Sequence, residues 1–176
     1  MTTDPTPTFE TLRRPEIAKR LIGSKDRIDR TMAELFSGYD LRAEDVLNDV
    51  VHVENYTGLV TVGDISFYSY CEHHFAPFFG TATVTYQPET IITGLGKLVR
   101  LVRDVHARRL QIQELMTRDI ALDIERVIRA KGVRVVTRAK HLCVCSRGPG
   151  DDNAWTEVEY SCGSLSLAKS TLLGGA

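Results

Sequence analysis

Residues 94–105 read Gly-Leu-Gly-Lys-Leu-Val-Arg-Leu-Val-Arg-Asp-Val, and their apolar side chains recur every three or four positions. This spacing is typical of an amphipathic helix. A second stripe of the same kind begins at Ile112 and runs to Ala130, and Gly132 interrupts the pattern. The sequence therefore predicts two helices in the middle of the chain.

On both sides of these helices, apolar residues alternate with polar ones, as in half-buried strands. Before the helices, we expect strands over Leu59–Phe67 and Thr81–Tyr86. After them, we expect strands over Val133–Thr137, Leu142–Cys145 and Trp155–Tyr160. This order predicts an α+β fold, in which an antiparallel sheet carries two long helices on one face.

Further helices are expected near the start of the chain. Pro15 suits the first turn of a helix over Glu16–Ile22, and a second helix is expected over Asp26–Phe36. We expect three parts in chain order: a Thr- and Pro-rich disordered tail over residues 1–8, a single domain over residues 9–163 and a tail over residues 164–176.

The composition is that of an ordinary globular protein, with 43% hydrophobic and 26% charged residues in a chain of 176. A formal net charge of −1 favours neither a nucleic-acid nor a membrane partner. The sequence has no apolar run long enough to span a membrane and no signal-peptide pattern, so we expect a cytoplasmic protein. Its four cysteines are then expected to be metal ligands or thiols rather than disulfides.

Two short clusters hold the residues best suited to chemistry: Cys-Glu-His-His at residues 71–74 and His-Leu-Cys at residues 141–143. Thiols and imidazoles bind Zn²⁺ in proteins, and Cys-x-x-His is a common chelating spacing. We expect Cys71, His74 and Cys143 to bind one zinc ion, with His73 and His141 beside it as proton-transfer groups. Three protein ligands would leave a position for water, as catalytic zinc sites do.

Cys145 leaves the ligand assignment open. If residues 142–145 form a strand, then His141, Cys143 and Cys145 share one face, because alternate side chains on a strand point the same way. Cys145 would then serve as a fourth ligand and make the zinc structural. The plainest alternative is a set of unconnected core thiols and surface imidazoles.

Four segments resemble the GTP cyclohydrolase I family, in the family's order and at its spacing. They are Phe67-Tyr-Ser-Tyr-Cys-Glu-His-His-Phe-Ala-Pro-Phe-Phe-Gly80, Gly94-Leu-Gly-Lys-Leu-Val-Arg100, Arg108-Arg-Leu-Gln-Ile-Gln-Glu-Leu-Met-Thr-Arg118 and His141-Leu-Cys-Val-Cys-Ser-Arg-Gly148. The first and last are highly specific together, whereas the helical segments are weak alone. The resemblance implies zinc bound by Cys71, His74 and Cys143. It also implies hydrolysis of GTP at C8 of guanine, with release of formate and formation of 7,8-dihydroneopterin triphosphate.

The resemblance further implies roles for the other site residues. His141 would protonate the purine near N7, and His73 would serve the later ribose steps. Gln113 and Glu114 would bind guanine, since a carboxylate accepts hydrogen bonds from both N1–H and the exocyclic amine. The triphosphate would be bound by a basic set: Lys97, Arg100, Arg147 and Arg30.

The resemblance also implies an assembly. Family members adopt the tunnelling fold and form toroidal homo-oligomers, typically decamers of two pentamers, with active sites between subunits. We therefore expect a neighbouring copy of this chain to complete the site.

The chain departs from the family's pattern near the expected ribose and triphosphate contacts. Gly96 stands where the family usually has a serine, and residues 149–162 form an acidic segment where the family usually has a Ser/Thr-rich strand. One alternative is therefore a divergent relative that opens a modified purine nucleotide or stops at an opened formamidopyrimidine. Another is a non-catalytic relative with structural zinc. A third, an enzyme resembling the nitrile reductase of deazapurine biosynthesis, would need a dinucleotide site, and the sequence has no glycine-rich loop of that kind.

Overall fold

The computed structural model describes residues 14–166. The chain divides into two compact units, Met1–Glu34 and Leu35–Ala176. The tail expected over residues 1–8 lies outside the described residues, as do residues 167–176 of the expected C-terminal tail. The single domain expected over residues 9–163 stays a prediction.

Two helices open the described part of the chain, α1 (Pro15–Ile22) and α2 (Lys25–Leu35). Pro15 occupies the first turn of α1, where its missing N–H costs no helical hydrogen bond. Both helices agree with their expected ranges to within one residue at each end. Neither contributes a buried residue, so the core is built by the elements that follow.

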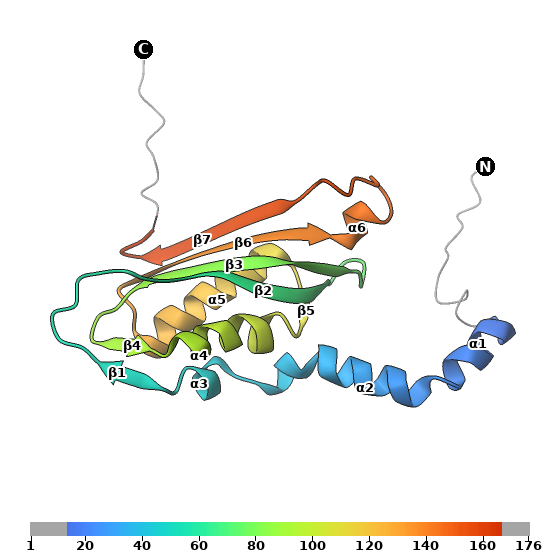
Figure 1. Cartoon of the computed structure of the whole chain (residues 1–176), viewed down its shortest axis with the longest axis horizontal. Helices are drawn as coiled ribbons and strands as arrows, with labels where there is room; N and C mark the ends of the chain where they lie inside the picture. Colours follow the sequence, from blue (N-terminus) through green and yellow to red (C-terminus); the bar gives the residue numbers. More distant parts are fainter. Residues whose placement is uncertain (1–13, 167–176) are drawn as a thin grey trace, which may run out of the picture. The chain divides into compact units, whose positions relative to one another are not determined.

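A five-stranded sheet lies at the centre of the second unit (Figure 1). Its strands, in spatial order, are β5 (Leu110–Gln111), β2 (Val60–Cys71), β3 (Pro77–Gln87), β6 (Gly132–His141) and β7 (Thr156–Gly163). Neighbouring strands are antiparallel, except for the short parallel pair of β2 and β5. A separate antiparallel pair, β1 (Val50–His52) and β4 (Ile91–Thr93), was not among the expected strands.

A β-bulge near the start of β2 sets which of its side chains face the core. The pairing with β3 shifts register between Val62 and Ile65, and Asp64 lies at a φ of 54°. A bulge of this kind adds one residue to a strand and bends it. The inward-facing positions therefore change from even to odd numbers, and Ile65, Phe67 and Cys71 are buried.

Helices cover one face of the five-stranded sheet (Figure 1). α4 (Leu95–Arg100) continues into a π-helical segment, η3 (Leu101–His106), and α5 (Gln113–Ile128) packs against β6 and β7. Most of the fully buried side chains on these helices are apolar, including Leu98, Leu101, Val102, Met116, Ile120 and Ile124. The expected α+β class, with an antiparallel sheet and helices on one face, is confirmed.

Three short helical segments complete the described chain: η2 (Ser37–Asp40), α3 (Ala43–Val46) and α6 (Leu142–Cys145). Among residues 14–166, no helix combines the length and the apolar character that crossing a membrane requires.

The strand expected over Leu142–Cys145 is wrong, because these residues form the helical turn α6. β6 ends at His141, which pairs with Phe78 of β3. The next position on β3 is Pro77, its first residue, which has no backbone N–H to offer a longer partner strand. The chain instead closes a turn, in which Ser146 N–H donates to the carbonyl oxygen of Leu142 at 2.9 Å.

Candidate metal centre and adjoining pocket

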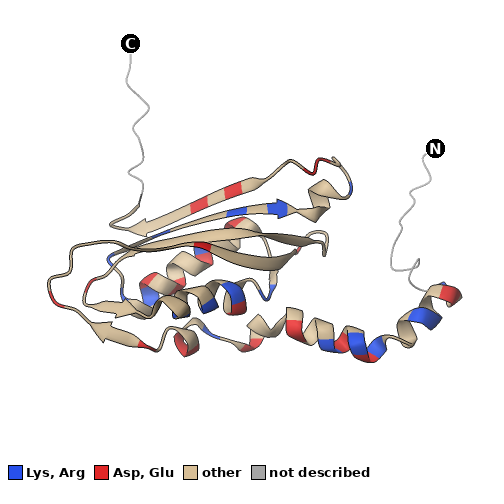
Figure 2. Ribbon diagram, viewed as in Figure 1, with Lys and Arg blue, Asp and Glu red and all other residues tan. Residues whose placement is uncertain are grey.

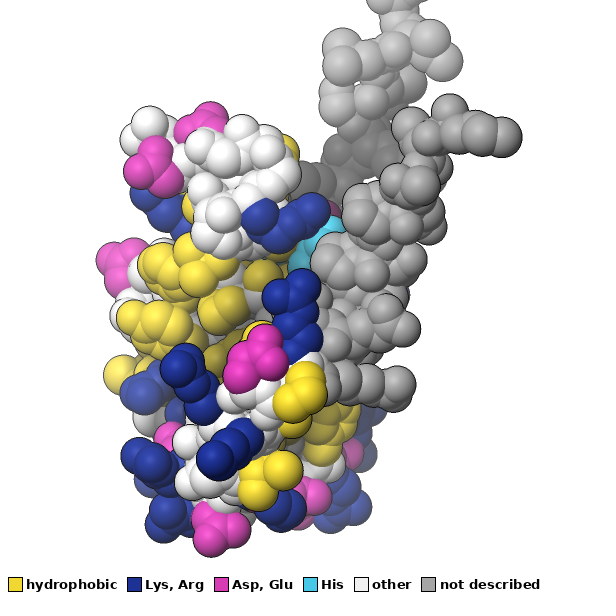
Figure 3. Space-filling model, turned by 90° about the vertical axis from the view of Figure 1, so that its right-hand side faces the viewer, with side chains coloured by type: hydrophobic (Ala, Val, Ile, Leu, Met, Phe, Trp, Pro, Cys, Tyr) yellow, Lys and Arg dark blue, Asp and Glu magenta, His cyan; other side chains and the backbone are white. Residues whose placement is uncertain are grey.

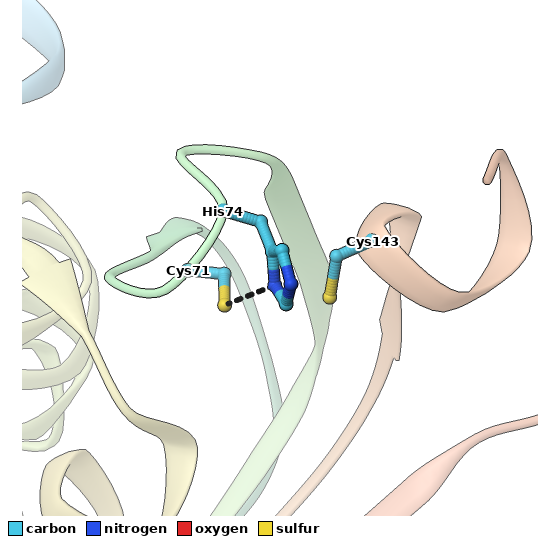
Figure 4. Close-up of side chains that lie close together, drawn as sticks. All are labelled: Cys71, His74 and Cys143. Carbon is cyan, nitrogen blue, oxygen red and sulfur yellow. Dashed lines mark hydrogen bonds between the residues drawn. The ribbon is translucent and has the colours of Figure 1, made fainter. Parts of the chain in front are cut away.

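Three side chains from separate points of the chain converge on one position. Cys71 ends β2, His74 lies in the turn that follows, and Cys143 lies in α6. One ligand atom from each residue lies within 4.8 Å of the other two, and Figure 4 shows the three side chains pointing toward one another. Among the described residues, this is the group of thiols, imidazoles and carboxylates with the geometry to hold a metal ion.

A strained turn brings His74 back toward Cys71. The Phe75 N–H donates to the carbonyl oxygen of Cys71 at 2.8 Å, and Phe75 lies at a φ of 52°. A positive φ is an outlier for a bulky side chain and requires support from neighbouring contacts. That support comes from the Phe75 ring, whose centroid lies 5.7 Å from that of Phe36 and 5.9 Å from that of Tyr70.

Cys145 does not join this group. The expectation that His141, Cys143 and Cys145 share a strand face is wrong, because residues 142–145 are helical. Residues two apart on a helix project in nearly opposite directions, since each residue turns the chain by about 100°. The arrangement therefore gives no support to a closed site with Cys145 as the fourth ligand.

The chemistry of the three donors fits a zinc ion. Burial raises the pKa of the Cys143 thiol, and the nearby Cys71 thiol raises it further. Thiolates are the form that binds metal. A cation between the two sulfurs would offset the repulsion of their negative charges, which is what makes the thiols hard to ionise without it. Two thiolates and one imidazole are common zinc ligands, and three protein ligands are typical of a catalytic site.

A pocket of about 280 Å³ adjoins the three donors. It is lined by Cys71, His73, His74, Gln111, Ile112, Gln113, Glu114, His141, Cys143, Val144 and Thr156. This volume lies near the lower end of the range for small-molecule sites, about 300–1,000 Å³. Seven of the eleven predicted site residues thus line one cavity: Cys71, His73, His74, Gln113, Glu114, His141 and Cys143.

His141 is held on two sides. Its ring stacks on that of Phe78, with centroids 4.5 Å apart and planes at 2°. Its Nε2 lies 2.7 Å from Oε1 of Gln113. Burial lowers the pKa of His141, while the Glu114 carboxylate acts in the opposite direction. His73, by contrast, is exposed where it lines the pocket.

Among the described residues, those that line the pocket do not include the four basic residues predicted to bind triphosphate. Lys97 and Arg100 lie on α4, which begins beside β4, at the end of the sheet away from α6 (Figure 1). Lys97 Nζ donates to Oδ1 of Asn48 at 3.0 Å. Arg147 follows α6 and donates to the carbonyl oxygen of Cys143 at 3.4 Å. Arg30 belongs to the first unit, where its Nε donates to the carbonyl oxygen of Asp26.

Sequence reasoning missed the polar residues behind the pocket. Thr117 and Thr137 are fully buried and hydrogen-bonded to each other and to Gln113. Thr137 lies at a core-facing position of β6, between Val135 and Ala139. A polar residue at an inward position of an alternating strand was the available signal, since a buried hydroxyl needs a partner.

Comparisons with known proteins were consistent with one another. A family model described as GTP cyclohydrolase I matches residues 9–171. The chain is 42% identical over 151 residues to GTP cyclohydrolase 1 of Chlorobium phaeovibrioides, covering 86% of this chain and 67% of the relative. It is 46% identical over 136 residues to GTP cyclohydrolase 1 of Campylobacter jejuni, covering 77% of this chain and 71% of the relative. For GTP cyclohydrolase 1 of Bacteroides fragilis, the identity is 40% over 149 residues, with 85% and 76% covered.

Among solved structures, the archaeosine synthase QueF-Like in the apo form resembles this chain at a TM-score of 0.46 and 13% identity. The likeness covers 64% of this chain and 99% of that one.

Proposed function

The chain belongs to the GTP cyclohydrolase I family, and we propose that it hydrolyses the imidazole ring of GTP at C8, releasing formate and forming 7,8-dihydroneopterin triphosphate. The observation that carries this proposal is the convergence of Cys71, His74 and Cys143 beside a pocket that also presents two imidazoles and a carboxylate. Zinc held by these three residues would act as a Lewis acid and lower the pKa of a water molecule toward neutrality.

The residues around the donors suit the proton transfers that ring opening requires. His141 would supply a proton near N7 of the purine, and His73 would serve the later ribose steps, because histidine transfers protons efficiently near neutral pH. Glu114 is exposed in the pocket, so its carboxylate is placed to accept hydrogen bonds from N1–H and the exocyclic amine of guanine.

We place the triphosphate on Lys97, Arg100, Arg147 and Arg30, and the incompleteness of the pocket in one chain supports a site shared between copies. Lys97 and Arg100 belong to an element at the other end of the sheet, so a second copy would bring its α4 to this pocket. We accordingly propose a tunnelling-fold homo-oligomer, expected to be a toroidal decamer.

A divergent activity stays as a second candidate, because Gly96 lacks the hydroxyl that the family usually carries beside its phosphate-binding lysine. A side chain would fit at this position, since a Cβ on Gly96 would meet no atom within 4 Å. The absence of a hydroxyl here therefore does not follow from packing. It affects the region expected to contact ribose and phosphate and leaves the three donors unchanged.

Incubating the purified, zinc-loaded protein with GTP tests both candidates. Formate together with a fluorescent pterin supports the full reaction. Formate with a formamidopyrimidine, identified by mass spectrometry, supports a reaction that stops after ring opening. If neither product forms, the proposal that GTP is the substrate is overturned. The variant His141→Ala is the control, because it should keep bound zinc and lose ring opening.

A further inference from the structure

Gln113 is the first residue of α5, and its side chain is only 2% exposed. Its amide nitrogen lies 3.1 Å from the carbonyl oxygen of Thr137 and 3.3 Å from that of Thr156. Its amide oxygen lies 2.7 Å from Nε2 of His141. The side chain thus joins the start of α5 to β6 and β7, and its hydrogen-bonding groups are engaged inside the protein.

The two carbonyl contacts fix the orientation of the amide. A backbone carbonyl can only accept a hydrogen bond, so the group that faces Thr137 and Thr156 must be the NH₂ of Gln113. The oxygen of the amide must then face His141. Because that oxygen can only accept, the hydrogen in this contact belongs to Nε2 of His141.

The buried threonine pair agrees with this direction. Thr117 Oγ1 lies 2.7 Å from the carbonyl oxygen of Gln113, which uses the one hydrogen of the Thr117 hydroxyl. In the 2.7 Å contact between the two hydroxyls, Thr137 must therefore be the donor. Thr137 Oγ1 then accepts from the amide nitrogen of Gln113, 3.0 Å away, whose two hydrogens are shared among three acceptors. The directions of these hydrogen bonds are mutually consistent.

From this network we propose that Gln113 is a positioning residue for His141, rather than a reader of guanine through its side chain. It holds the hydrogen of the neutral ring on Nε2, and the Phe78 ring fixes the plane. The nitrogen left to meet the substrate is then Nδ1, because the partner of one ring nitrogen determines which of the two carries the hydrogen. Nδ1 would donate to the purine after gaining a second proton, and the ring would return to the form with its hydrogen on Nε2. The catalytic part of this inference rests on the proposed function; the placement of the hydrogen does not.

Nitrogen-15 NMR of the histidine rings tests the placement directly, since the two neutral forms give distinct nitrogen shifts. The spectrum is recorded on zinc-loaded protein at a pH above the titration range of free imidazole. Subtracting the spectrum of His141→Asn identifies the His141 signals among those of the five histidines. We expect wild type to show the hydrogen on Nε2. A wild-type ring with its hydrogen on Nδ1 would overturn the proposal.

Variants of Gln113 separate positioning from mere packing. Gln113→Met keeps the length of the side chain and removes its acceptor, so we expect a mixture of the two ring forms with zinc content unchanged. Gln113→Glu keeps an acceptor facing His141 and should keep the hydrogen on Nε2. It should also lower the melting temperature, because a carboxylate would face the carbonyl oxygens of Thr137 and Thr156. If Gln113→Met left the ring form unchanged, the proposal would be wrong.

A neighbouring glutamine provides the control. Gln111 lines the same pocket, but its amide nitrogen donates to the carbonyl oxygen of His106 at 2.7 Å. Gln111→Met should therefore leave the His141 signals as in wild type. Should Gln113→Met fail to fold, Thr137→Val takes its place, because it removes one acceptor of the amide. We expect it to give a smaller share of the His141 form with hydrogen on Nδ1 than Gln113→Met would.

Turnover adds a second, separate readout. If GTP is the substrate, Gln113→Met should lower kcat by about 10- to 100-fold, less than the roughly 10²–10⁴-fold of a whole general acid–base contribution because His141 remains, and change KM little. A side chain that reads guanine would instead raise KM, and that result would overturn the assignment. Because the NMR experiment uses no nucleotide, a failure to release formate from GTP would count against the proposed function alone.

Discussion

At the scale of single residues, Cys143 and Cys145 show how one helical turn separates two thiols of equal promise. Both belong to α6, yet only Cys143 has its sulfur within 4.8 Å of the ligand atoms of Cys71 and His74. We predict that Cys143→Ala lowers zinc affinity by more than about 100-fold. Loss of a group that is only hydrogen-bonded to a metal-binding side chain already lowers the affinity by about 10- to 100-fold. Cys145→Ala should keep full zinc occupancy.

Metal analysis by mass spectrometry after dialysis, with titration against a chelator, measures both variants. Equal zinc loss in the two variants would mean that both sulfurs bind the ion and that the site is closed. Full retention in Cys143→Ala would remove Cys143 from the ligand set.

A variant of Glu114 tests how the pocket would select guanine over other purine bases. Glu114→Gln keeps the size of the side chain but replaces one acceptor oxygen with a donor. We expect kcat/KM for GTP to fall by about 10- to 100-fold, because a hydrogen bond to a charged group contributes about 1.5–3 kcal/mol. The comparison substrate is inosine triphosphate, which keeps N1–H and lacks the exocyclic amine. Wild type should prefer GTP over inosine triphosphate by a larger factor than Glu114→Gln does. An equal preference in the two proteins would mean that Glu114 does not contact the exocyclic amine.

At the scale of the elements, the sequence patterns located the helices and the long strands, because the apolar residues of each recur at regular intervals, interrupted in β2 by its bulge. α5 begins one residue after Ile112, where the predicted stripe starts, and its last residue, Ile128, belongs to that stripe. The strand predicted over Leu142–Cys145 failed for a reason outside the segment, since its pairing partner ends at Pro77. Short alternating runs are ambiguous until the neighbouring strand is known.

The candidate site divides along the same line. The convergence of Cys71, His74 and Cys143 could be predicted, because side chains that bind metal are few and their spacing is restrictive. The network of Gln113, Thr117 and Thr137 could not, because it joins α5 to β6 through contacts between residues 20–24 positions apart. Which nitrogen of His141 carries a hydrogen depends on that network.

A cluster of hydrogen-bonded polar side chains ties α5 to its neighbours. His106 of η3 lies 3.1 Å from Asp123 of α5, and Arg126 contacts both Asp123 and Glu44 of α3. Burial acts to raise the pKa of Asp123, but hydrogen bonds from His106 and Arg126 outweigh it and hold the pKa below its ordinary value. A lowered pKa in the folded state stabilises the fold above the unfolded pKa, about 3.9, and this contribution is lost as the pH falls through the folded pKa.

We therefore predict that Asp123→Asn lowers the free energy of unfolding at pH 7 by about 1–2 kcal/mol, less than a full charged hydrogen bond because asparagine keeps one acceptor. The difference from wild type should shrink as the pH falls below about 4. Urea unfolding at several pH values measures it. The control is Asp119→Asn on the same helix, where Asp119 pairs with its half-exposed neighbour Arg118 and a change below about 0.5 kcal/mol is expected. A difference that grew toward low pH would contradict the assignment.

At the scale of the whole molecule, several features of the second unit favour association with further copies. Among residues 14–166, its sheet has open edges at β7 and along the part of β2 that β5 does not cover. Unpaired edges offer backbone groups to another chain. Oppositely charged residues face each other on β6 and β7 (Figure 2), and Arg134 pairs with Glu159 at 2.8 Å, so these charges are already partly satisfied within the chain.

Hydrophobic surface points the same way. Hydrophobic side chains gather on the face drawn in Figure 3. Large hydrophobic side chains with high exposure include Tyr68 at 69% and Trp155 at 49%. Contiguous exposed apolar surface commonly marks an interface. Together with a pocket that lacks its predicted phosphate-binding residues, this surface argues for a site completed by a neighbour.

Mixing two defective variants tests whether the site is shared. Lys97→Ala removes a predicted phosphate contact on α4, and Cys143→Ala removes a zinc ligand at the pocket. If α4 of one copy serves the pocket of another, co-expression in equal amounts should give oligomers in which about one site in four carries neither defect, by random assortment. Activity should then recover to about that fraction of wild type, measured as formate release at a GTP concentration below KM. If each pocket used its own α4, every site would carry a defect and no recovery would be seen.

The pair Lys97→Ala and Arg100→Ala is the matched control for this experiment. Both substitutions lie on α4, so any site would receive one or the other, whichever copy supplies the helix. Co-expression of this pair should therefore give no recovery, even though the oligomers assemble normally by light scattering. Recovery in the control would mean that Lys97 and Arg100 serve different sites, and it would separate their roles. Recovery in the first pair alone would assign the zinc donors to one subunit and the phosphate-binding face of α4 to another.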